Sequence, residues 1–327
     1  MAILSRVRQF ADYAMALLLA TTVSASPILS RDAQATTVFQ FETNGTWIEN
    51  IAIRPDGDLL LTRMDEPELW TVNPVDGSRS LVHRFDQATA LMGITHIHDD
   101  RYAVVVGNVT IAEIGQPTPG SFSLWAVNMA ADSPQISPIA AIPEAGWLNG
   151  MACLDDESGT LLVADSVNGV IWKVDPLSGH YEVALSGHSL EQNGQALGVN
   201  GVHAAGDMVY YTSSSLDSLF RVPVDTEGLA AGPVETVAAS NSLPDDFALA
   251  SDGTAYLMAN VDNQVQRVSP SGELSTLVGS KDSSLVAGPS AGQISTDGSI
   301  LYVVTCGGHI APPQGRLEPA KVVAIRL

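Results

Sequence analysis

Four oxygen-bearing side chains stand at matching places in the sequence, each directly before a short apolar phrase. They are Glu49, Asn149, Asn200 and Asp245, and two further copies of the phrase have Met92 and Ala291 at this place. Carboxylate and amide oxygens that meet at one point are the ligands that Ca²⁺ and Mg²⁺ prefer. No Cys or His shares the place, which argues against zinc. The pattern therefore predicts a site for a hard divalent cation, with hydrogen bonding to strand ends as the alternative.

The phrase belongs to a longer unit that occurs six times. Each unit has a short strand, a turn rich in Asp and Gly, an apolar strand, an alternating strand and an outer strand. The short strands begin at residues 50, 93, 150, 201, 246 and 292. Asp and Gly supply the left-handed geometry of tight hairpins. Four antiparallel strands in about 45 residues are typical of one blade of a β-propeller.

The repeat predicts an all-β fold, a six-bladed β-propeller over residues 36–327. The sixth unit ends after its third strand, so we expect residues 37–41 to supply its outer strand and close the ring, which removes a free sheet edge. No helical period separates the strands, which disfavours a doubly wound α/β fold; two stacked sandwich domains are the alternative. The first strand of each propeller blade lines the central channel, so the four polar residues would meet at one mouth of it.

Residues 1–25 have the pattern of a secretory signal peptide. A basic start (Arg6, Arg8) precedes a short apolar run over residues 14–20, and small residues stand at positions 23 and 25. The run is shorter than the roughly 20 residues that a membrane span needs. We expect a protein that is secreted or enters the secretory pathway, without a membrane span. The sequons at Asn44 and Asn108 are candidate glycosylation sites.

Charge and composition exclude several classes of partner. The chain has 15 Lys and Arg against 36 Asp and Glu, a net charge of −21. Such a chain repels nucleic-acid phosphates and anionic membranes. With 45% hydrophobic residues it is too apolar to be disordered. No His-Glu-x-x-His motif occurs. We expect small-molecule partners, no organic cofactor, and a monomer or weak dimer.

The pattern resembles the gluconolactonase, regucalcin and strictosidine-synthase-like six-bladed propellers. In their metal-dependent members a Glu before the first blade, the Asn of an Asn-Gly pair and the Asp of a Pro-Asp-Gly phrase hold the ion, with a second Asn-Gly asparagine close by. Glu49, Asn200 and Asp245 match these ligands, and Asn149 matches the second asparagine. The resemblance therefore implies Ca²⁺ or Mg²⁺. Asp246 replaces the Gly of the last phrase, a departure that bears on the local turn.

A secreted fungal branch of this group is more similar. The similarity lies in the stretch from Gly45 to Arg54 and in the stretch from Leu60 to Trp70. The branch includes hetero-Diels–Alderases of tropolone–sesquiterpenoid biosynthesis, which join a tropolone o-quinone methide to a humulene-type alkene in a dihydropyran ring. The resemblance implies this reaction here, on small apolar substrates. Holding two reactants in a near-attack geometry supplies about 7–11 kcal/mol of such a barrier.

Side chains near the four polar residues fit apolar substrates. An aromatic and thioether lining suits a polyene and a flat ring better than a sugar. For any single residue, packing between blades is the alternative. The candidate substrate-binding residues are Trp47, Met92, His96, Trp147, Met151 and His309.

Three candidates remain for catalysis. His203 or Arg63, or else the cation, would polarise the carbonyl of the oxadiene, although a core histidine is the alternative for His203. Asp245 would act as a base if the chain is instead a metal-dependent lactonase. A third hypothesis is a non-catalytic extracellular binding propeller, which predicts an exposed apolar patch and no deep pocket.

Overall fold

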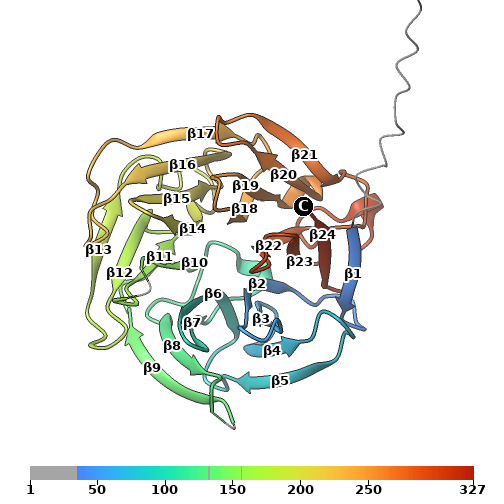
Figure 1. The fold of residues 1–327 in the computed structure, drawn as a ribbon, viewed down its shortest axis with the longest axis horizontal. Coiled ribbons are helices and arrows are strands. Elements are labelled where there is room, and N and C mark those ends of the chain that lie inside the picture. Colours follow the sequence, from blue (N-terminus) through green and yellow to red (C-terminus); the bar gives the residue numbers. More distant parts are fainter. Residues whose placement is uncertain (1–34, 132, 156) are drawn as a thin grey trace, which may run out of the picture.

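Six four-stranded antiparallel sheets surround a central axis (Figure 1). The computed structural model describes residues 35–131, 133–155 and 157–327. The six-bladed β-propeller predicted from the repeat is confirmed. The predicted signal peptide, residues 1–25, lies outside the described residues.

Each of the first five blades runs outward from the axis, strand by strand, in the order of the chain. The first blade holds β2 (Ile48–Ile53), β3 (Leu59–Arg63), β4 (Glu68–Val72) and β5 (Arg79–Arg84). The second holds β6 (Ala90–His98), β7 (Arg101–Gly107), β8 (Ser123–Asn128) and β9 (Gln135–Ala141). The third holds β10 (Leu148–Cys153), β11 (Leu161–Asp165), β12 (Val170–Val174) and β13 (Tyr181–Ser186).

The remaining blades follow the same plan. The fourth holds β14 (Val199–Ala205), β15 (Met208–Ser213), β16 (Ser218–Pro223) and β17 (Glu235–Ala239). The fifth holds β18 (Pro244–Leu249), β19 (Ala255–Ala259), β20 (Gln264–Val268) and β21 (Leu274–Gly279). The sixth combines β22 (Pro289–Ile294), β23 (Ile300–Thr305) and β24 (Lys321–Arg326) with the N-terminal strand β1 (Ala35–Gln40).

Strand β1 closes the ring as expected. It pairs antiparallel with β24, where Thr37 lies opposite Val323 and Phe39 opposite Val322. The first and last described strands therefore share one sheet, and β24 is not left as an unpaired edge. Among the described residues, no helix has the length and apolar character needed to cross a bilayer.

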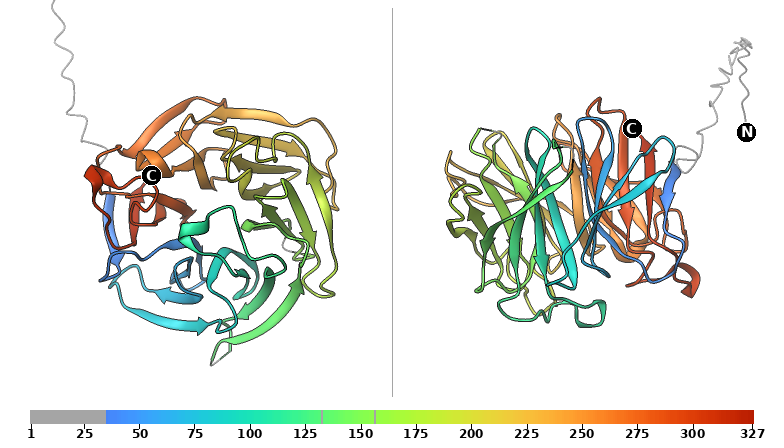
Figure 2. Two further views of the ribbon diagram at one scale, coloured as in Figure 1. Left: turned by 180° about the vertical axis from the view of Figure 1, so that it is seen from behind. Right: turned by 90° about the horizontal axis from the view of Figure 1, so that it is seen from below.

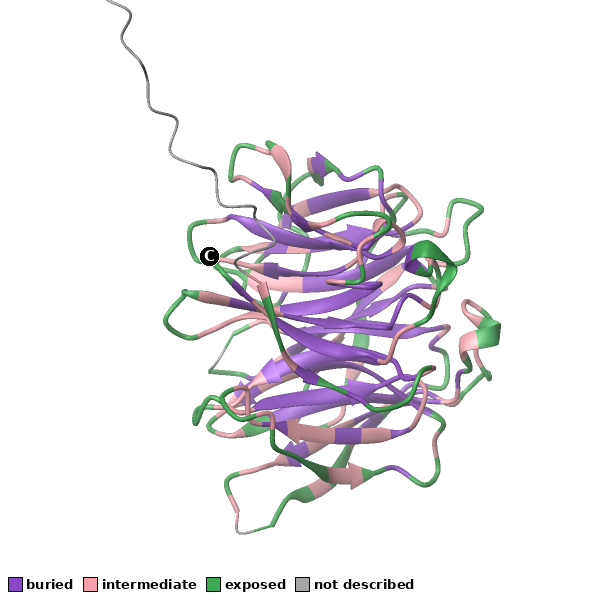
Figure 3. Ribbon diagram, turned by 90° about the vertical axis from the view of Figure 1, so that its right-hand side faces the viewer, coloured by how far each residue is buried: buried purple, intermediate pink, exposed green. Residues whose placement is uncertain are grey.

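The core lies between the faces of adjacent blades. Middle strands are covered on both faces, so most of their residues are apolar; Leu59, Leu60 and Leu61 of β3 are all buried. Figure 3 shows the buried residues along the inner strands and the exposed ones in the turns. Cys153 and Cys306 belong to different blades, and no disulfide joins them.

A bulge interrupts the axial strand of every blade at the same height. The regular pairing breaks, for example, between Leu148 and Met151 and between Val199 and Val202. A bulge releases its residue from the ladder and re-aims the side chain. The glycine after Asn200 serves this packing, because a Cβ on Gly201 would come within 2.1 Å of Asp246 Oδ1.

The position of the bulge in the sixth blade shows that the predicted counterpart of Glu49, Ala291, is wrong. In the sixth blade the break falls between Pro289 and Ala291. The residue equivalent to Glu49 is therefore Ser290 and not Ala291. The Ser290 hydroxyl donates to the carbonyl of Ile48 at 2.6 Å, so it joins the first and last blades.

Candidate functional site

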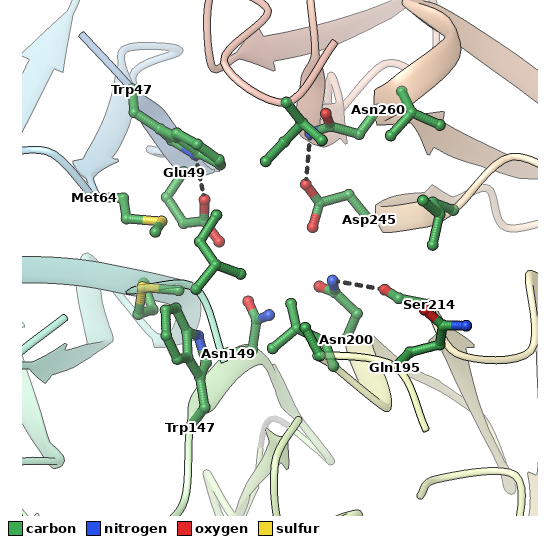
Figure 4. Close-up of a pocket in the computed structure, with 17 residues that line it drawn as sticks. Trp47, Glu49, Met64, Trp147, Asn149, Gln195, Asn200, Ser214, Asp245 and Asn260 are labelled. Carbon is green, nitrogen blue, oxygen red and sulfur yellow. Dashed lines mark hydrogen bonds between the residues drawn. The ribbon is translucent and has the colours of Figure 1, made fainter. Parts of the chain in front are cut away.

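One mouth of the channel is a pocket that brings the four polar residues together (Figure 4). Glu49, Asn149, Asn200 and Asp245 all line it, each from the bulge of its axial strand. The cavity volume is about 240 Å³. The loop between β7 and β8 lies over the centre of the ring on one face (Figure 2), and its Ile114 also lines the pocket.

Two serines orient the two asparagines. Asn149 Nδ2 donates to Ser166 Oγ at 3.2 Å, and Asn200 Nδ2 donates to Ser214 Oγ at 3.0 Å. Both serines directly follow the second strand of their blade. The amide oxygen of Asn200 is buried without a hydrogen-bond partner. Sequence reasoning missed these serines, although a polar residue after the second strand of two successive blades was a usable signal.

Glu49 is buried and Asp245 is partly buried, and neither carboxyl group has a basic neighbour among the described residues of the pocket lining. Glu49 Oε2 accepts the indole N–H of Trp47 at 2.6 Å, and Asp245 Oδ2 accepts the amide of Asn260 at 3.0 Å. The described residues that line the pocket include no Lys, Arg or His. Burial, reinforced by repulsion from Asp245, raises the pKa of Glu49 well above its usual value. Burial likewise raises the pKa of Asp245 to about 7. Glu49, Asn149, Asn200 and Asp245 form the floor of the pocket, and near neutral pH its two carboxyl groups need a proton or a cation.

The floor of the pocket fits a hard divalent cation. Two carboxylates and two amides offer oxygen ligands of the kind that Ca²⁺ and Mg²⁺ bind. The unpartnered Asn200 Oδ1 also supports a bound cation, because a buried acceptor without a partner is unfavourable until a ligand satisfies it. Among the described residues, no three His, Cys, Asp or Glu form a metal cluster, so the two amides are essential to this donor set.

The wall of the pocket is apolar. Trp47, Met64, Met92 and Trp147 are all buried and line it. His309 stacks on Trp47, with ring centroids 5.4 Å apart and planes inclined by 28°. Apolar residues from the loops complete the rim: Ile114, Leu197, Leu243, Val261 and Ile310. Met64 was missed from the sequence; it follows β3 as Ser166 follows β11.

Three candidate residues lie elsewhere in the channel. His96, Met151 and His203 line a separate cavity of about 120 Å³, together with Asn50 and Asp246. They follow the bulges along their axial strands, so they lie further along the channel than the four polar residues. His203 Nε2 lies 3.3 Å from Asp246 Oδ1 without a hydrogen-bond geometry. These three therefore line a different cavity from Trp47, Met92 and Trp147.

Arg63 is held in the wall of the first blade. It is the last residue of β3, and its guanidinium forms ion pairs with Asp65 and Glu68. Its Cζ lies 4.8 Å from the ring centroid of Phe41. Arg63 does not line the pocket. From the sequence we expected it to polarise a substrate carbonyl, but the structure does not place it to do so.

The two sequons differ in exposure. Asn44 is exposed in the turn before β2, whereas Asn108 is partly buried just after β7. The Thr46 hydroxyl of the first sequon is buried, accepts from the Ala320 N–H at 2.7 Å and donates to the Thr43 carbonyl. Asn44 is therefore the sequon asparagine with more room for a glycan.

Fold and site together define a six-bladed β-propeller with a ligand pocket at one channel mouth. The fold is similar to that of regucalcin from Agrobacterium tumefaciens, a calcium-binding protein, with a TM-score of 0.62, 18% identity, and 88% of this chain and 92% of that chain covered. It is also similar to a luciferin-regenerating enzyme, with a TM-score of 0.64, 13% identity, and 87% and 92% covered. No family model matches the chain.

Two curated proteins are similar in sequence. One, from Phoma sp, is named "Putative hetero-Diels-Alderase"; it is 28% identical over 315 residues, which cover 84% of this chain and 87% of that protein. The other, from Sarocladium schorii, is named "Putative hetero-Diels-Alderase asR5"; it is 27% identical over 303 residues, which cover 80% and 75%. The chain thus resembles both the regucalcin-like propellers and the proteins with these names.

Proposed function

We propose that the chain is a hetero-Diels–Alderase of fungal secondary metabolism. It would join a tropolone o-quinone methide to a humulene-type sesquiterpene and form a dihydropyran ring. The observation that carries this proposal is a pocket with an oxygen-rich floor and an apolar wall of indoles and thioethers. Similarity to two proteins named as hetero-Diels–Alderases, over about four-fifths of the chain, supports the class of reaction.

The wall suits the chemistry because the reaction needs position more than reactive groups. A cycloaddition has no leaving group, so it requires no activated nucleophile. The indoles of Trp47 and Trp147 offer flat apolar surfaces, and Met64 and Met92 offer thioethers that adapt to an irregular alkene. Binding both reactants in a near-attack geometry can remove about 7–11 kcal/mol of barrier.

The floor orients the oxygen-bearing reactant. We propose that Glu49, Asn149, Asn200 and Asp245 hold Ca²⁺ or Mg²⁺, which would act as a Lewis acid toward a carbonyl oxygen. The serines fix the asparagine amides in place, and the Trp47 indole fixes Glu49. Apolar rim residues exclude water from the reactants once both are bound.

The direct test supplies the tropolone precursor and the humulene-type alkene with and without the protein. We expect faster product formation and a single stereoisomer when the protein is present. Equal yield and equal stereochemistry in both reactions would overturn the proposal. Heat-denatured protein at the same concentration is the control for nonspecific sequestration of apolar reactants.

A metal-dependent lactonase is a second candidate. The observation that favours it is the position of Asp245, a carboxylate in the pocket floor of the type that serves as a general base. This candidate predicts hydrolysis of simple lactones that stops with a chelator and returns with Ca²⁺ or Mg²⁺. Unchanged lactone hydrolysis in a Glu49→Gln, Asp245→Asn double variant would count against it.

A further inference from the structure

Trp147 is the exception among the five tryptophans of the chain. The indole N–H groups of the other four donate to side chains: Trp47 to Glu49, Trp70 to Glu68, Trp125 to Ser123 and Trp172 to Asp165. The N–H of Trp147 is buried without a partner, and the side chain lines the pocket. A buried donor without an acceptor is unfavourable, so its place in a pocket wall calls for a ligand.

The indole N–H of Trp147 lacks a partner because one position of the repeat differs between the first and third blades. Trp47 and Trp147 stand at the same place, two residues before the bulge residue of their blades. In the first blade the bulge residue is Glu49, which accepts the Trp47 N–H. In the third blade it is Asn149, a shorter side chain whose amide is held by Ser166. The intramolecular acceptor is therefore lost in the third blade.

The backbone around Trp147 is fixed. The backbone N–H of Trp147 donates to Asp165 Oδ1 at 2.9 Å, and the Trp147 carbonyl accepts the Ser166 N–H at 2.8 Å. The buried Asp165 carboxylate also accepts from Gly146 and from the indole of Trp172. This network holds the start of β10 in place, so the unpartnered indole cannot escape its position by a shift of the chain.

Unpartnered polar atoms also gather at this site. Within the described chain, Asn200 Oδ1 and Asn260 Oδ1 are buried acceptors without a donor, and both residues line the same pocket as Trp147. In Figure 4 the nitrogen-bearing edge of the Trp147 indole faces Asn149, at the boundary of wall and floor. A ligand that offers an acceptor oxygen at this boundary, with an apolar body against the wall, matches both surfaces.

We propose that Trp147 donates its indole N–H to the carbonyl oxygen of the bound oxadiene. The inference rests on the proposed function and adds a hydrogen-bond donor to it. In the cycloaddition three π bonds become one new C–C bond, one new C–O bond and one new C=C bond, and the carbonyl oxygen becomes the ring ether. The proton stays on the indole nitrogen throughout. A donor at this oxygen stabilises the charge that develops on it in the transition state.

The test removes the N–H and keeps the shape of the ring. In Trp147→β-(3-benzothienyl)alanine, sulfur replaces the indole N–H. The probes are tropolone, which has a carbonyl, and cycloheptatriene, which has no oxygen, both with a chelator present. We expect tropolone affinity and kcat/KM for the cycloaddition each to fall about tenfold. Cycloheptatriene affinity should stay the same, and Tm should stay the same or rise, because no intramolecular hydrogen bond is lost.

The matched control is the same replacement at Trp125, whose N–H donates to Ser123 outside the pocket. There we expect a lower Tm and unchanged tropolone affinity. Equal tropolone affinity in native protein and the residue-147 variant would overturn the inference. A native protein that binds tropolone through Trp147 but does not accelerate cycloaddition would instead overturn the proposed function. The indole nitrogen of Trp147 is not accessible to solvent. A crystal structure with tropolone should therefore show the indole ring turned toward the ligand, with its nitrogen within about 3 Å of the tropolone oxygen.

Discussion

Asn50 and Asp246 meet across the central channel, although their blades are not neighbours. Asn50 Nδ2 donates to Asp246 Oδ2 at 2.8 Å, and both side chains are buried. Each directly follows a carboxyl residue of the pocket, Glu49 or Asp245. The bridge therefore lies below the pocket floor, between it and the cavity that contains His203. It also places a third carboxylate close to the two in the floor.

Removing that third charge should change how Asp245 titrates. Repulsion from Asp246 contributes to the raised pKa of Asp245. In Asp246→Asn, we expect the Asp245 carboxyl to titrate at a lower pH, because its anion loses a negative neighbour. Carboxyl ¹³C NMR titration without divalent cations measures this. Asp252→Asn, in an exposed turn, is the control; an Asp245 pKa that is equal in both variants would contradict the role of Asp246.

The raised carboxyl pKa values also predict a pH dependence of stability. Asp245 ionises near pH 7 in the folded chain and near its ordinary value of 3.8 when unfolded. Its contribution to the free energy of unfolding should be full at low pH and decline as pH rises from about 4 to 7. Urea denaturation with a chelator, compared between native protein and Asp245→Asn, checks this. The native protein should lose more stability over that range, and parallel pH profiles would refute the effect.

Added Ca²⁺ should reverse the trend, because a cation binds the ionised floor and only the folded chain assembles it. We expect saturating Ca²⁺ to raise the free energy of unfolding more at pH 8 than at pH 5. The Asp245→Asn variant should show a smaller difference. Stabilisation that is independent of pH would indicate that the ion binds elsewhere.

The serines behind the asparagines should control affinity for the cation. Ser166→Ala or Ser214→Ala releases the amide of Asn149 or Asn200, so its oxygen is no longer held toward the pocket. Partners behind metal ligands typically contribute about 10–100-fold in affinity. Calorimetric titration with Ca²⁺ should show a loss of this order. Ser123→Ala, which removes the partner of Trp125 in the second blade, should leave Ca²⁺ affinity unchanged.

The fold was predictable because the blade repeats with a nearly constant period, and each copy shows its turn and apolar strand. The convergence of Glu49 and its counterparts followed from that period, since equivalent residues of a ring share one height. Local bulges could not be read from the pattern. They moved the sixth position to Ser290 and sent His96, Met151 and His203 to the other cavity.

Side-chain partners could not be read from the sequence either. Arg63 was a candidate to polarise a substrate carbonyl, but Asp65 and Glu68, two and five residues later, form ion pairs with it. The rim residues Leu243 and Ile310 come from loops without a period. Trp147 was predicted as an apolar contact, whereas its unpartnered N–H becomes apparent only once every neighbour is in place.

The exposed Asn44 offers a test of the proposed secretory route. We propose that residues 1–25 direct secretion and that Asn44 carries a glycan, since its side chain is exposed in a turn. The protein secreted from a fungal host should begin at residue 26 and lose mass with a deglycosylating enzyme. Asn44→Gln should abolish most of that loss with little change in Tm.

Thr46→Ala removes the same sequon but should lower the free energy of unfolding by about 1–3 kcal/mol, because the Ala320 N–H loses its buried acceptor. Secreted protein with an unmodified Asn44 would refute the glycan, and retention inside the cell would refute the route.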